Sequence, residues 1–232
     1  MKQQLLPVPE TAAEQQLTTR GLDRRRFLLQ AAGVASVAAI AGACHKSNDD
    51  SGINLGSGDV GILNYAYALE QLEAAFYTAA VSAPYNGITP SEQALLTDIR
   101  DHEIAHREFF KTALGANAIV SLEVNFSSIN FTSRDSVLSA AKAFEDLGVS
   151  AYNGAGRLIT STDYLLLAGK IVSVEARHAG YIRDLISNGS FADNTIVAAS
   201  TGLDQARMPN DVLAIASTYL KSKLNASNLP TS

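Results

Sequence analysis

The chain has 232 residues, a formal net charge of −5 and 47% hydrophobic residues, a composition typical of a globular protein with one domain or two small ones. Its single cysteine excludes an internal disulfide framework and a cysteine-rich zinc or iron–sulfur site, so any metal must be bound by histidines and carboxylates. The 18 lysines and arginines form no dense basic face beyond the first 30 residues, which excludes nucleic acid as a partner.

Residues 1–43 are predicted to be an export signal. An arginine run at 24–26 precedes an apolar stretch of small residues at 31–43, which is too short to span a bilayer. The paired arginines resemble a twin-arginine signal, and Ala-Gly-Ala-Cys at 41–44 resembles the lipobox of a bacterial lipoprotein. We therefore expect export to the periplasm or cell envelope, with a lipid on Cys44 as the attachment to the membrane. A retained N-terminal anchor helix is the alternative.

Residues 44–58 are rich in Ser, Asn, Asp and Gly and are predicted to form a flexible tether. Beyond the tether, apolar residues recur at helical spacing in four long segments. Thr89 and Pro90 are typical of a helix start, as N-cap and first helical residue. The four predicted helices cover residues 60–81, 89–114, 133–154 and 161–188.

The lengths of the connections predict how these helices are arranged. Short turns join the first helix to the second and the third to the fourth, whereas residues 116–132 break the helical period and form a long connection. This pattern predicts an all-α fold, an antiparallel four-helix bundle at 59–189 with one long crossover connection. A C-terminal extension at 190–232 is expected to add one helix, from residue 209 or 210 to 222, and strand content is expected to be negligible.

The two halves of the predicted bundle repeat one pattern. Segments 68–77 and 143–152 share Ala, Glu, Leu and Tyr at the same relative positions. The second and fourth helices each contain Glu-x-x-His, at 103–106 and 175–178. From the single glutamate to this motif there are 33 residues in the first half and 30 in the second. Such near-equality is what two copies of a helical hairpin produce.

This spacing predicts a metal site. Residues three apart lie on one face of a helix, so each Glu-x-x-His places a carboxylate beside an imidazole. Four buried carboxylates would repel one another and would be costly to desolvate, and two cations would offset that penalty. The predicted ligands are Glu70, Glu103, His106, Glu145, Glu175 and His178.

The pattern resembles the ferritin-like carboxylate-bridged dimetal superfamily over about residues 59 to 189. Within it, the pattern is similar to bacterial ferritin-like domain proteins, including the exported desiccation-related group. The resemblance implies that the glutamates of the two Glu-x-x-His motifs bridge two ions, and that each histidine binds one of them. The ions are expected to be two Fe or Mn, because hard oxygen ligands with two imidazoles suit these metals better than Cu.

Three further residues lie close to the predicted ligands. Glu73 is one turn from Glu70 and is an alternative to it, but the repeat places Gly148 at the corresponding position, which favours Glu70. Tyr77 and Tyr152 each follow their glutamate by seven residues on the same face. We consider them candidate catalytic residues that hydrogen-bond a ligand carboxylate or pass electrons, and simple packing is the alternative.

A competing motif occupies the same helix. Residues 102–106 spell His-Glu-x-x-His, the zinc metallopeptidase signature in which both histidines bind zinc and the glutamate is the general base. No third histidine follows at the metzincin spacing, and Glu123 lies in the irregular connection. Val174 stands where the second half would need a histidine, and zinc leaves the motif at 175–178 unexplained. The dimetal hypothesis is therefore favoured, both over zinc and over a plain bundle with solvated acids.

Two functions are compatible with such a site. The first is an oxidoreductase, a ferroxidase or a catalase- or peroxidase-like enzyme that reacts with O₂ or H₂O₂ and protects the envelope from stress. The second is a metal-binding or structural envelope protein without turnover. A homo-oligomer is left open, although a lipid anchor would hinder assembly of a closed storage shell.

Overall fold

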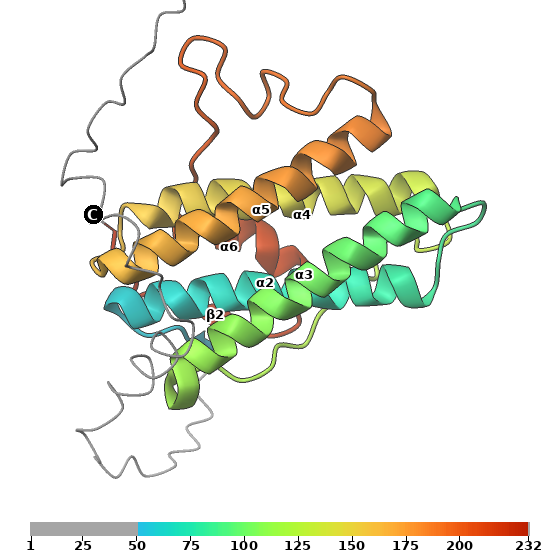
Figure 1. Ribbon diagram of the computed structural model, residues 1–232. Coiled ribbons are helices and arrows are strands. Elements are labelled where there is room, and N and C mark those ends of the chain that lie inside the picture. Colours follow the sequence, from blue (N-terminus) through green and yellow to red (C-terminus); the bar gives the residue numbers. More distant parts are fainter. Residues whose placement is uncertain (1–50, 232) are drawn as a thin grey trace, which may run out of the picture. The chain divides into compact units, whose positions relative to one another are not determined.

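Four long helices dominate the structure, a computed structural model that describes residues 51–231 (Figure 1). These helices are α2 (Gly58–Ser82), α3 (Pro90–Leu114), α4 (Arg134–Gly156) and α5 (Thr162–Ile186). The smaller elements are β1 (Ile53–Asn54), η1 (Gly115–Asn117), α6 (Pro209–Ala216), η2 (Ser217–Tyr219) and β2 (Leu224–Asn225). The predicted all-α fold class is confirmed.

The predicted export signal at 1–43 and Cys44 lie outside the described residues. Within residues 51–231, no helix is both long and apolar enough to cross a bilayer.

The helices form two hairpins. Helix α2 packs against α3, α4 packs against α5, and the hairpins meet along α2 and α4. The connection at 115–133 runs along the bundle, so α4 begins at the end where α3 begins (Figure 1). At that end the Arg134 side chain donates to Glu92 Oε1 at 2.7 Å and to the carbonyl of Leu185 at 3.1 Å. These bonds join the starts of α3 and α4 to the last turn of α5.

Polar side chains set the starts of three helices. The Thr89 hydroxyl accepts from the backbone N–H of Glu92 at 3.2 Å, and the Glu92 carboxylate accepts from the backbone N–H of Thr89 at 3.1 Å. This is a capping box, and Pro90 follows it at the first helical position. Ser133 and Ser161 cap α4 and α5. The predicted starts of these helices are confirmed.

Aromatic rings fill the part of the bundle towards the end of α2 and the start of α4. The ring centroids of Phe76 and Phe144 are 4.9 Å apart, and those of Phe144 and Tyr219 are 4.7 Å apart. Phe126 and Phe131, from the long connection, pack against Phe76 at 6.0 and 5.9 Å. The crossover thus closes this part of the core.

The opposite part of the bundle is less filled. A cavity of about 30 Å³ lies there, lined by apolar side chains from all four long helices. They include Leu69 of α2, Phe110 of α3, Tyr152 of α4 and Ile171 of α5.

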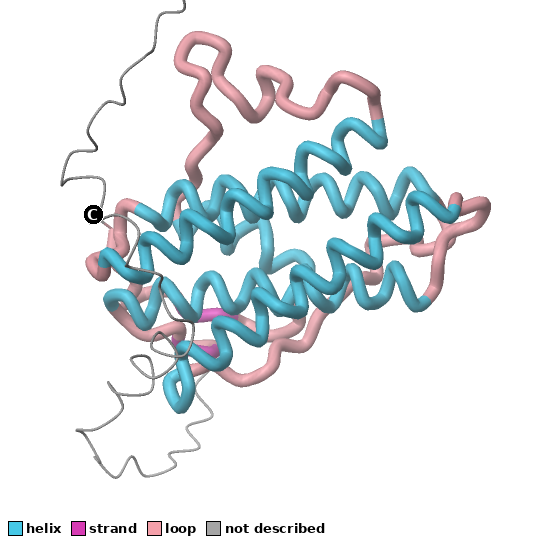
Figure 2. Tube along the Cα trace, viewed as in Figure 1, coloured by secondary structure: helices cyan, strands magenta, loops and turns pink. Residues whose placement is uncertain are grey.

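The start of the folded region differs from the prediction. The tether was expected to extend to residue 58, but β1 pairs in parallel with β2 near the start of α2 (Figure 2). Leu55 is fully buried. Ile53 and Leu55 are two apolar residues in a polar segment, and burying them orders the end of the predicted tether.

The last helix is shorter than predicted. It was expected to reach residue 222 but ends at Ala216, where a 3₁₀ turn follows. Beyond that turn, the backbone N–H groups of Lys221 and Ser222 donate to the carbonyl of Glu123 at 2.8 and 3.3 Å. The long connection therefore competes with the helix for these backbone donors.

The C-terminal extension also contacts α4 closely. The backbone N–H of Arg207 donates to the carbonyl of Ser150 at 2.9 Å. A Cβ atom on Gly154 would lie 1.7 Å from the Arg207 carbonyl oxygen. Gly154 is therefore needed for this approach, and α4 continues past it to Gly156.

Candidate metal centre

The structure brings the six predicted ligands together inside the bundle. They form two groups in which one ligand atom from each residue lies within 4.8 Å of the others. The first group is Glu70, Glu103, His106 and Glu175, and the second is Glu103, Glu145, Glu175 and His178. Glu103 and Glu175 belong to both groups.

Each hairpin contributes one single glutamate and one Glu-x-x-His motif. Helices α2 and α4 supply Glu70 and Glu145, while α3 and α5 supply the two motifs. The three-residue spacing places the glutamate and histidine of each motif on one helical face. All four glutamates have zero exposure, and 13% of the His106 side chain is exposed.

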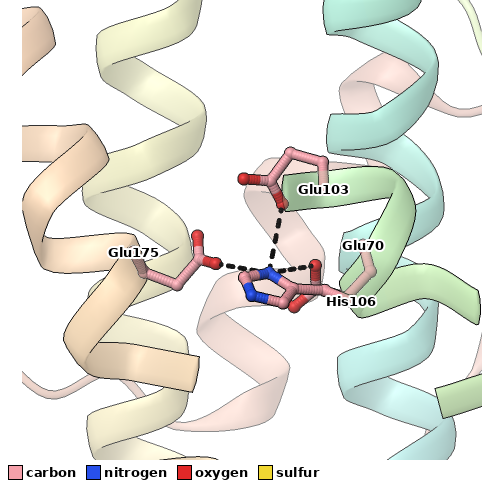
Figure 3. A group of neighbouring side chains, drawn as sticks. All are labelled: Glu70, Glu103, His106 and Glu175. Atoms are coloured by element: carbon pink, nitrogen blue, oxygen red, sulfur yellow. Dashed lines mark ion pairs between the residues drawn. The ribbon is translucent and has the colours of Figure 1, made fainter. Parts of the chain in front are cut away.

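Three carboxylates converge on His106 in the first group. Its Nδ1 lies 2.9 Å from Glu175 Oε1, 3.4 Å from Glu70 Oε2 and 3.7 Å from Glu103 Oε2. Figure 3 shows these carboxylates approaching the same ring nitrogen from different sides. Four potential ligands from three helices thus face one small volume.

The second group is built in the same way around His178. Its Nδ1 lies 2.9 Å from Glu103 Oε1 and 3.4 Å from Glu145 Oε2. Glu103 therefore directs one oxygen to His178 and the other to His106. A carboxylate in this position is able to bridge two ions.

The hydrogen bonds of the buried ligand atoms test whether a metal pair fits. Eight of these atoms have no hydrogen-bond partner in the described structure. They are both carboxylate oxygens of Glu103 and Glu175, Oε2 of Glu70 and Glu145, and Nδ1 of His106 and His178. Buried polar atoms without hydrogen bonds are costly, and the ion-pair contacts described above among these atoms require protonated histidines; carboxylate oxygens with imidazole nitrogens are suitable ligands for Fe or Mn. The donor set therefore fits two such ions.

The pKa values show how strongly these groups interact without metal. Burial raises the pKa of Glu70 to about 7, against the opposing effect of His106, and burial with the Glu103 charge raises that of Glu175 well above its usual range. Burial lowers the pKa of His106, but contacts with Glu103 and Glu175 outweigh it and raise the value to about 12. The cluster thus retains protons that bound cations would displace.

Glu73 lies beside the two groups and belongs to neither. It is 3% exposed, and its Oε2 has no hydrogen-bond partner in the described structure. A Cβ atom on Gly148 would lie 3.0 Å from Glu73 Oε1. Burial, with the charges of Glu175 and Glu103, raises the Glu73 pKa well above its usual range. The structure therefore places Glu70 in a ligand group and Glu73 in a neighbouring space left by a glycine.

The two candidate catalytic tyrosines contact ligand carboxylates across the hairpins. The Tyr77 hydroxyl donates to Glu145 Oε1 at 2.5 Å, and the Tyr152 hydroxyl donates to Glu70 Oε1. Each tyrosine thus contacts the glutamate of the other half. The sequence indicates that the tyrosines share a face with the glutamates, but the crossed pairing depends on how α2 meets α4.

His102 lies outside both ligand groups, contrary to the zinc alternative. Its Nδ1 instead lies 2.9 Å from Nε2 of His178. Glu123, the third zinc ligand considered, is exposed, and its backbone contacts the C-terminal segment. The sequence does not reveal the contact between His102 and His178, because it depends on the side-by-side placement of α3 and α5.

The four-helix bundle contains two carboxylate–histidine groups that share two glutamates. This arrangement is typical of helical proteins that bind metal in the core of the bundle. The family model of the ferritin-like domain matches residues 58–188, more than half of the chain. The chain therefore belongs to the ferritin-like domain family. The match spans α2 to α5 and so includes all six predicted ligands. A comparison with curated proteins gives no match.

Proposed function

We propose that this protein binds two Fe or Mn ions and acts as an exported oxidoreductase that reacts with H₂O₂ or O₂ in protection of the cell envelope. The observation that supports it is the set of eight buried ligand atoms without hydrogen bonds, arranged in two groups that share Glu103 and Glu175. Four ligand carboxylates would balance the charge of two divalent cations, which is the simplest neutral state of the site.

When bound, such a pair of ions would supply redox chemistry: two electrons with two protons would convert one H₂O₂ to two molecules of water, and oxidation of a second H₂O₂ to O₂ would return two electrons and two protons. The chain contributes a buried site and rigid ligands. Tyr77 and Tyr152 each hold one oxygen of a ligand glutamate and leave its other oxygen without a hydrogen bond.

Elemental analysis of the full chain, recovered after native export, tests the metal pair. We expect two Fe or Mn per chain, with loss of metal in Glu103→Ala and in His178→Ala. One zinc per chain, lost on substitution of Glu103 or His106 and retained in His178→Ala, would contradict the proposal and favour a metallopeptidase.

Activity is tested on the same protein by H₂O₂ consumption, O₂ release and Fe(II) oxidation. We expect at least one of these activities, with loss in Glu103→Ala. A protein that binds two ions and shows none of them would instead be a metal-binding envelope protein without turnover.

Export is tested separately by cell fractionation. We expect the full chain in the envelope fraction, and retention in the cytoplasm when Arg24 and Arg25 are both changed to lysine. Replacement of Cys44 by serine is expected to release the exported protein from the membrane. Envelope localisation that survives the double lysine change would contradict the twin-arginine route.

A further inference from the structure

His102 and His178 form an edge-to-edge imidazole pair. Their rings are inclined by only 8°, and the centroids are 5.1 Å apart. Nδ1 of His102 and Nε2 of His178 are separated by 2.9 Å. The centroid distance is close to the sum of this separation and the two ring radii, so both nitrogens lie near the line between the centroids. The rings are therefore almost coplanar, which is the geometry of an N–H···N hydrogen bond and not of face-to-face stacking.

The surroundings of His178 fix the direction of this bond when a metal is bound. Its Nδ1 faces Glu103 and Glu145 in the second ligand group. An imidazole that gives the lone pair of one nitrogen to a metal carries its proton on the other nitrogen. Nε2–H of His178 therefore donates to Nδ1 of His102. In this way His102 selects the tautomer of His178 and the orientation of its ring.

His106, the counterpart of His178 in the repeat, lacks such an accepting side chain. The repeat aligns His102, which precedes Glu103, with Val174, which precedes Glu175. A valine side chain cannot accept a hydrogen bond. Within residues 51–231, Nε2 of His106 makes no hydrogen bond, although its Nδ1 faces the carboxylates as that of His178 does. The two histidines therefore have similar inner contacts and different outer ones.

We propose that His102 is a positioning residue for His178 and makes the two metal positions unequal. The ion bound by Glu103, Glu145, Glu175 and His178 is then the more tightly held of the pair. An accepted hydrogen bond makes the imidazole a stronger ligand and limits its rotation, and loss of such partners weakens metal binding by about 10- to 100-fold. This inference rests on the proposed dinuclear site.

Calorimetric titration of the metal-free full chain with Mn(II) tests the inequality directly. In His102→Val we expect one of two binding steps to weaken by about 10- to 100-fold and the other to change little. His102→Asn is expected to restore most of the affinity, because its side-chain oxygen replaces the accepting Nδ1. Val174→Ala is the matched control at the corresponding position and should leave both steps unchanged.

A double-mutant cycle identifies the affected ion. His102→Val should weaken binding in a His106→Ala background, which retains His178, and should have no further effect in a His178→Ala background. Equal weakening of both steps, an unchanged titration, or failure of His102→Asn to restore affinity would overturn the inference while leaving two ions per chain intact. A wild-type chain that binds fewer than two ions would overturn the proposed function as well. Because His102 is exposed, its variants are expected to keep the helical circular dichroism of the wild type.

Discussion

The α2–α3 hairpin and the α4–α5 hairpin supply the same predicted ligands in different surroundings. Each provides one single glutamate, one Glu-x-x-His motif and one tyrosine that contacts the partner hairpin. The first hairpin adds Glu73 and His102, where the second has Gly148 and Val174. The repeat thus accounts for the ligand set, and the departures from it make the two halves different.

The cores around the two tyrosines differ in the same way. Tyr77 lies against Phe76, at 5.0 Å between ring centroids, in the aromatic part of the bundle. Tyr152 instead lines the cavity of about 30 Å³. The tyrosine that contacts Glu145 therefore packs among aromatic rings, and the tyrosine that contacts Glu70 lies beside a cavity. The comparison teaches that a repeated set of predicted ligands can lie in unequal surroundings.

The largest expected effect distinguishes the shared glutamates from the single ones. Glu103→Ala and Glu175→Ala should each lose both ions, because both groups contain these residues. Glu70→Ala and Glu145→Ala should each retain one ion. Elemental analysis of the purified full chain measures the difference.

Glu73→Ala is the matched control for that series, because Glu73 is buried one turn from Glu70 and belongs to neither group. It should retain two ions per chain. Loss of an ion in this variant, with retention of both in Glu70→Ala, would transfer the ligand role from Glu70 to Glu73.

Metal removal is expected to have the next largest effect, through both groups at once. At a free metal concentration about 100 times the dissociation constant, each bound ion contributes about 2.7 kcal/mol to the free energy of unfolding. For a domain of this size, chelation of two ions should therefore lower Tm by about 10–20 °C. Differential scanning calorimetry before and after chelation checks this, and an unchanged Tm would contradict a bound pair.

The decrease in Tm on chelation should also depend on pH. The pKa values of Glu70, His106 and His178 are raised to about 7, 12 and 10, so the metal-free native state holds more protons than the unfolded state. Its stability therefore falls as pH rises from about 5.5 to about 8. Metal ions compete with these protons, so affinity rises over the same range. The difference in Tm should widen with pH, and a constant difference would contradict this explanation.

Tyrosine substitutions should produce smaller effects, of similar size in the two halves. Tyr77→Phe leaves an oxygen of Glu145 without its donor, and should destabilise the metal-free protein by about 1.5–3 kcal/mol. Tyr152→Phe should have an effect of similar size, because Glu70 Oε1 loses its donor and the adjoining cavity, lined mainly by apolar side chains, offers a replacement water few polar partners. Denaturant unfolding at fixed pH measures both changes.

Tyr65→Phe is the control for these variants. The Tyr65 hydroxyl is buried without a hydrogen-bond partner in the described structure, so its removal should cause little loss of stability. A clearly smaller loss in Tyr152→Phe than in Tyr77→Phe would contradict this prediction and show that water from the cavity reaches Glu70.

The smallest expected effect concerns the glycine that faces Glu73. Gly148→Ala brings a Cβ atom to 3.0 Å from Glu73 Oε1, so the carboxylate must shift in a crowded site. We expect this variant to be about 1–2 kcal/mol less stable than Gly169→Ala, whose Cβ would have no neighbour within 4 Å. Denaturant unfolding measures the difference, and combination with Glu73→Ala should remove it. A difference that persists in that double variant would exclude Glu73 as the cause.

The sequence predicts much of this fold because the necessary signals are local. Thr89, Ser133 and Ser161 cap their own helices, and the repeated spacing places each Glu-x-x-His on one helical face. The connection lengths then predict which helices are neighbours. The placement of six ligands around one interior follows from these few rules.

Other features depend on contacts between distant segments and were not predicted. Leu55 is buried because β1 pairs with β2, at the far end of the described chain. Helix α6 ends early because backbone donors after it bind the long connection. Likewise, His102 gains its partner from α5, and no spacing within α3 indicates this contact.

The crossed tyrosine–glutamate bonds have a consequence for a cleaved chain. Since each hairpin holds a carboxylate of its partner, and both ligand groups draw on both hairpins, neither hairpin contains a whole site. Proteolysis within residues 115–133 would leave two fragments that complement each other. Bound cations would then hold these fragments together, and their reassembly would depend on the availability of metal.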